Sequence, residues 1–144
     1  MMRSWNTYLI LVVVVVSGAA AVLGAELYQA RAEVRTLLES AANDTALRQG
    51  AREIAVGVNS WAVDHGDSFP PPGVVDRRSL ISPAGKSYAR QWPANPFTGE
   101  PVHAGSAPGD YLYARTGAGL GYRLIVMGAG GKPAAIIEIS PTPQ

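Results

Sequence analysis

The chain of 144 residues contains no cysteine, which excludes disulfide bonds, thiolate metal ligands and cysteine nucleophiles. It also lacks an excess of either charge, because 12 Lys and Arg side chains stand against 11 Asp and Glu side chains. A balanced charge creates no long-range field, so no nucleic-acid partner is expected. Only two histidines occur, His65 and His103, and neither has a second ligand at the spacing of a zinc site.

Motifs for catalysis or cofactor binding are missing as well. The glycine-rich run 117–121 precedes an expected strand rather than a helix, so it indicates a hairpin turn and not a dinucleotide site. Residues 128–132 end like a P-loop, but Pro133 stands where a Ser or Thr would hold magnesium. The acidic residues after position 63 do not follow the spacing of a calcium loop. We expect no enzyme activity, no catalytic residue, no cofactor, no metal site and no small-molecule substrate.

An apolar run near the N-terminus gives the strongest positive signal. Residues 8–25 contain 18 positions without a charge, and as a helix they span ~27 Å, close to the ~30 Å core of a bilayer. We expect residues 1–25 to form a membrane anchor helix in contact with lipid, in a single-pass cell-membrane protein with an extracytoplasmic C-terminal head. The anchor residues are Tyr8, Leu9, Ile10, Leu11, Val12, Val13, Val14, Val15, Val16 and Leu23. Alternatively, the Ala19–Ala21 pattern is a cleavage site, and the run is removed as a signal peptide.

Residues 26–66 are expected to continue the anchor as an amphipathic helix that ends near His65, because they contain no proline and are rich in helix formers. The face that should pack on the head recurs at spacings of 4, 3, 4 and 3, and it consists of Leu47, Ala51, Ile54, Val58 and Trp61. The part from Glu26 to Ala42 has no obvious partner within the chain. It packs on neighbouring subunits or stands in solvent.

Residues 67–144 are expected to form the head, in which a Pro-rich connector is followed by a β meander. Short strands are predicted at 111–115, 122–127 and 134–139, separated by glycine-rich turns of hairpin length. The predicted fold class is α+β, with a long N-terminal helix packed on a small three-stranded antiparallel sheet.

Three segments in this order, behind a long helix, carry a family resemblance: 58–70 (VNSWAVDHGDSFP), 92–99 (WPANPFTG) and 121–132 (GYRLIVMGAGGK). They resemble the helix exit, the proline turn and the closing strand of type IV pilins and type II secretion pseudopilins, particularly the major-pseudopilin type. The resemblance implies a pilin-like fold and a structural role in such a filament or in protein transport. Other pilin-like subunits or envelope assembly proteins would be its partners. The chain departs from the family in lacking the prepilin peptidase motif.

Two functions remain open at this point. The first is a membrane-anchored, pilin-like structural subunit or accessory of a type IV pilus or type II secretion filament. The second is an exported, soluble binding module whose apolar run has been removed. In that case the aromatic residues Trp92, Phe97 and Tyr111 are candidate contacts, although each also fits a turn or core position.

Overall fold

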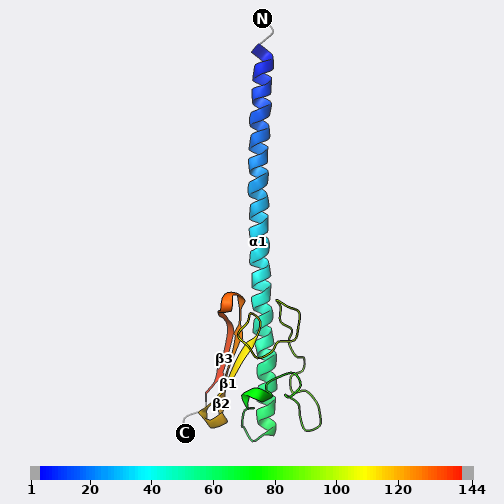
Figure 1. The fold of residues 1–144 in the computed structure, drawn as a ribbon, viewed down its shortest axis with the longest axis vertical. Coiled ribbons are helices and arrows are strands. Elements are labelled where there is room, and N and C mark those ends of the chain that lie inside the picture. Colours follow the sequence, from blue (N-terminus) through cyan, green and yellow to red (C-terminus); the bar gives the residue numbers. More distant parts are fainter. Residues whose placement is uncertain (1–3, 141–144) are drawn as a thin grey trace. The chain divides into compact units, whose positions relative to one another are not determined.

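The computed structural model describes residues 4–140, and it describes side chains from Gly24 onward. The elements are α1 (Ser4–Asp64), β1 (Tyr111–Thr116), β2 (Gly121–Met127) and β3 (Pro133–Ile139), with three short 3₁₀ helices, η1 (Pro72–Val74), η2 (Gly117–Gly119) and η3 (Ala129–Gly131) (Figure 1). One long helix and a three-stranded antiparallel sheet confirm the predicted α+β class. The chain divides into two compact units, residues 1–41 and residues 42–144.

In the first unit, the expectation of a membrane span is corrected. No helix among the residues that the structure describes is long and apolar enough to cross a bilayer. From Gly24 onward α1 carries Glu26, Arg31 and Glu33 at short intervals, and these charges interrupt any apolar stretch. The expected anchor positions 8–16 and 23 lie outside the residues with described side chains. The finding contradicts a transmembrane, single-pass cell-membrane protein with an extracytoplasmic head.

The sheet of the second unit is a meander in the order β1-β2-β3. Tyr111 of β1 pairs with Val126 of β2, and Val126 pairs in turn with Ala135 of β3. The next pair is Met127 with Pro133, so Ala134 is an extra residue that forms a bulge in β3. All three strands lie within one residue of their predicted bounds, because glycine-rich turns flank alternating or apolar runs.

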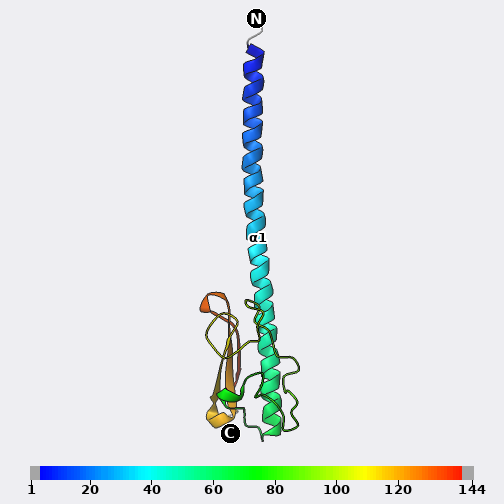
Figure 2. The same ribbon diagram turned by 45° about the vertical axis from the view of Figure 1, so that its right-hand side comes forward.

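The core of this unit lies between the sheet and the part of α1 from residue 42 onward, and these segments run side by side in both views (Figures 1 and 2). Leu47, Ala51, Ile54 and Val58 are buried there, and Trp61 is partly buried against them. The sheet contributes the buried side chains Tyr111, Tyr122, Leu124 and Val126. Burial of each large apolar side chain stabilises the fold by about 1.5–3 kcal/mol.

The connector covers another side of the same helical segment, and two helical glycines permit this close approach. A Cβ atom on Gly57 would lie 2.8 Å from Leu80 Cδ2 and 3.1 Å from Ala89 N, and one on Gly50 would lie 3.0 Å from Pro93 Cβ. The helix ends where Gly66 adopts a φ of 65°, a conformation that glycine tolerates at a helix C-terminus.

Candidate binding surface

Residues 92–102 form a small, tightly bonded loop, here called the 92–102 hairpin. Its two arms are joined by the Ala94–Pro101 bridge and by a hydrogen bond from Val102 N to Pro93 O at 3.1 Å. The indole Nε1 of Trp92 donates to Val102 O at 2.8 Å and closes the base of the hairpin. The backbone of the hairpin is therefore fixed at its base by contacts within the chain.

Asn95 fixes the other end of the hairpin through bonds to Phe97 and Pro108. It is buried, its Oδ1 accepts from Phe97 N at 2.9 Å, and its Nδ2 donates to Pro108 O at 2.9 Å. Its backbone O also accepts from Gly99 N at 2.8 Å. Gly109 leaves room for the amide, because a Cβ atom there would overlap Asn95. The tip at residues 96–99 is thus held to the 103–110 loop through one amide side chain.

The three aromatic residues proposed as contacts differ in their exposure to solvent. Tyr111 is 1% exposed, so of its two interpretations the core position agrees with the structure and the contact role does not. Trp92 is partly buried and lies edge-on to the Tyr111 ring at 6.2 Å between centroids. Phe97 is 39% exposed at the tip of the hairpin. Of these three aromatic residues, Phe97 presents most to a partner.

Two hollows flank the hairpin. The first has a volume of about 220 Å³ and is lined by residues that include Gln49, Glu53 and Pro93. The second is wider, about 580 Å³, and is lined by Asp76, Arg77, Arg78, Pro101, Val102 and His103.

The rim of the second hollow is basic. Asp76 Oδ1 accepts from Arg78 N at 2.7 Å and from Ser79 N at 3.0 Å. Burial raises the pKa of Asp76, but the hydrogen bonds from Ser79 and Arg78 outweigh burial and bring the pKa below its ordinary value. Within the described part of the chain, the guanidinium groups of Arg77 and Arg78 form no ion pair shorter than 4 Å. The charge of Arg78 also helps to lower the pKa of Asp76, so Arg77 is the more available of the two to an acidic group.

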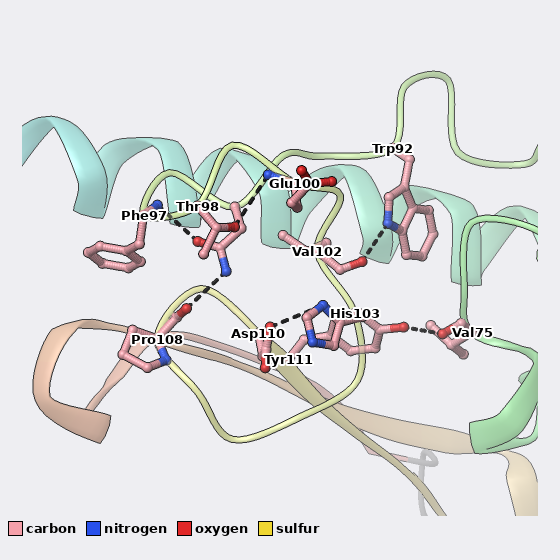
Figure 3. A network of polar contacts seen from close by, with 11 residues as sticks. Val75, Trp92, Phe97, Thr98, Glu100, Val102, His103, Pro108, Asp110 and Tyr111 are labelled. Carbon is pink, nitrogen blue, oxygen red and sulfur yellow. Dashed lines mark hydrogen bonds and ion pairs between the residues drawn. The ribbon is translucent and has the colours of Figure 1, made fainter.

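A buried carboxylate and a buried phenol interact with neighbours of this hollow. The carboxylate of Asp110 is buried, and its Oδ1 lies 3.4 Å from Nδ1 of the exposed His103 ring (Figure 3). The hydroxyl of Tyr111 donates to Val75 O. Burial, together with the carboxylates of Asp76 and Asp110, raises the pKa of Tyr111 to about 12. The two side chains therefore contact residues next to or within the lining of the hollow, namely Val75 and His103.

Among the residues with described side chains, no three His, Cys, Asp or Glu gather as a metal site would require. The sequence matches no protein-family model, and no characterised protein or solved structure is significantly similar to it. The resemblance to pilins and pseudopilins therefore stays a prediction.

Sequence reasoning found Trp92 and Phe97 but missed Asn95, Asp110 and the two arginines. A signal for Asn95 existed in the Asn-Pro-Phe-Thr-Gly turn, because Asn side chains commonly cap such turns. The basic rim had no comparable signal, because the connector brings 76–78 and 101–103 together only in the folded chain.

Proposed function

We propose that this chain is a non-catalytic binding module, exported with its apolar N-terminal run removed, that binds a partner protein through the 92–102 hairpin. The observation that carries the proposal is Phe97, a half-exposed aromatic ring on a loop fixed by the Asn95 hydrogen bonds. Aromatic side chains of this kind are the usual anchors of protein interfaces.

A preformed loop favours binding because its ordering cost has already been met in folding. Fixing a flexible backbone costs about 1–2 kcal/mol per residue, so a mobile tip of residues 96–99 would lose about 4–8 kcal/mol of affinity on ordering. The bonds from Asn95 to the tip reduce this cost. Arg77 and Arg78 lie beside the second hollow. The partner that fits is a protein with an apolar pocket for Phe97 at the tip of the hairpin and carboxylates that face Arg77 and Arg78 beside its base.

The proposal is tested with the tagged full-length gene in the native host. The chain recovered from the medium is expected to begin at Val22 and to bring one partner with it. Phe97→Ala should abolish that co-purification, whereas Leu120→Ala, at an exposed position between β1 and β2, should leave it unchanged. Equal recovery of the partner with both variants would refute a role for the hairpin.

A pilin-like structural subunit is the second candidate, favoured by the surface of α1 in the first unit. Side chains from Gly24 to Ala41 are exposed, including large apolar ones at Leu27, Val34 and Leu37. With Ala30 and Ala41 these residues recur at spacings of 3 and 4, which is the pattern by which like helices pack together. The occupant of this face would be the same helix of other copies of the chain.

This second function predicts assembly that depends on the helix face. Changing Val34 and Leu37 together to Gln should dissociate any native assembly of the chain. Changing Thr36 and Ser40 to Gln should leave the assembly intact, because these polar residues lie outside the 3-4 spacing. Persistence of the assembly in the first variant would remove the support for a pilin-like subunit.

A further inference from the structure

The outer edge of β3 has no backbone partner among the residues that the structure describes, since β3 is bonded to β2 alone. The opposite edge, β1, is partly covered: Tyr111 N donates to His103 O at 3.1 Å, and Gly105 N donates to Tyr111 O at 2.9 Å. No residue of β3 is fully buried. An open edge presents unpaired N–H and C=O groups and is a template for another strand.

Only part of this edge is suited to pairing. The bulge at Ala134 and the missing N–H of Pro133 disrupt the beginning of β3. The regular stretch that remains is residues 135–139. It has one charged side chain, Glu138, which lies 3.7 Å from Arg123 of β2. The rest of the stretch is apolar, which is unusual for an edge that stays exposed.

We propose that β3 pairs in antiparallel fashion with β3 of a second copy of this chain, with the two Ile137 residues opposite each other on a two-fold axis. Ala135 then faces Ile139 of the second copy, and Ile136 faces Glu138. Ala135, Ile137 and Ile139 pack against the core and are only partly buried. Pairing places them beside their counterparts and extends the core from one sheet into the next.

The chemistry of the strand selects this register. A pairing centred on Ile136 would run into the bulge at Ala134 and lose regular bonds. A pairing centred on Glu138 would set two carboxylates opposite each other, which is unfavourable. The register centred on Ile137 uses all five regular residues, keeps core-facing side chains on one side, and opposes no like charges.

Single cysteines test the register directly, because the chain has none of its own. Ile136→Cys and Glu138→Cys change exposed positions. Opposed residues in such a pair have Cβ atoms about 4.5–5.5 Å apart, which is close to disulfide distance. Under mild oxidation, a mixture of the two full-length variants should cross-link as a heterodimer faster than either variant with itself.

Leu112→Cys is the matched control, because residue 112 is similarly exposed but lies on β1. Its mixture with Glu138→Cys should cross-link no faster than random collision. Equal cross-linking in this control would overturn the proposal, as would an Ile136→Cys homodimer that forms as fast as the heterodimer.

Charge changes at residue 136 provide a second test, because a positive and a negative side chain there should change the dissociation constant of the dimer in opposite directions. Lys at this position would face Glu138 of the second copy and strengthen the dimer, and Glu would weaken it. Two such pairs form per dimer, so each change should alter the dissociation constant by roughly two- to thirtyfold. Sedimentation equilibrium of Ile136→Lys and Ile136→Glu measures both. A chain that stays monomeric, or a shift in the same direction for both variants, would contradict the β3 pairing.

Discussion

Replacing Asn95 with alanine is expected to lower the free energy of unfolding by about 1–3 kcal/mol. The side chain forms two hydrogen bonds, to Phe97 N and to Pro108 O, both at 2.9 Å. Each such bond contributes a net ~0.5–1.5 kcal/mol, and two together give the stated range. Phe97 and Pro108 are themselves exposed, so water can reach the freed groups. The larger penalty for orphaned buried groups is therefore not expected.

Urea unfolding followed by tryptophan fluorescence measures this loss, and hydrogen exchange at the Phe97 amide reports the loop itself. The matched control is Thr98→Ala in the same exposed tip, where the hydroxyl accepts only a long bond from Glu100 N at 3.3 Å. Thr98→Ala should cost less than ~0.5 kcal/mol. If Asn95→Ala costs no more than this control, the hairpin does not depend on the Asn95 amide and the argument for a preformed loop is refuted.

Three further predictions concern the core. Gly57→Ala should destabilise the fold by up to about 2 kcal/mol, because the new methyl group comes too close to Leu80 and Ala89, which costs ~1–3 kcal/mol and outweighs a helix-propensity gain of ~1 kcal/mol. A raised melting temperature would contradict this. Leu124→Ala should cost about 2–5 kcal/mol in urea unfolding, since this side chain is fully buried; a loss well below ~1 kcal/mol would show that it is not a core residue. Burial raises the pKa of Tyr111 from 10.0 to about 12, so its contribution to the free energy of unfolding is complete below pH 10 and falls as the pH rises toward 12. In urea unfolding, Tyr111→Phe should lose less stability than the unchanged chain between these pH values, and an equal loss would contradict the raised pKa of Tyr111.

The sheet and the buried helix face could be read from local patterns. The strand bounds follow from alternation between glycine-rich turns, and the spacing of Leu47, Ile54 and Val58 selects residues that are buried. Both signals depend only on residues that are close in sequence, so they can be recognised without knowledge of the fold. Alternation does not say which side of a strand faces the core, so Tyr111 fitted both a core position and a contact, and its burial decides for the core.

The candidate binding surface could be predicted only in part. The proline turn and its aromatic residues are visible in the sequence, and Trp92 does pin the hairpin while Phe97 remains exposed. The burial of Asn95 and Asp110 depends on the 103–110 loop lying against the hairpin and β1. Such contacts between separate segments leave no periodic trace in the sequence.

Site-specific photo-cross-linking tests the central claim of a binding hairpin most directly. A benzophenone amino acid is placed at residue 97 of the full-length chain in the native host, and a second preparation carries it at residue 120, which is more exposed (56% against 39%), as a reference. The binding-module function predicts one discrete cross-linked protein from residue 97 and none from residue 120. The same product from both positions, or no product from residue 97, would contradict it.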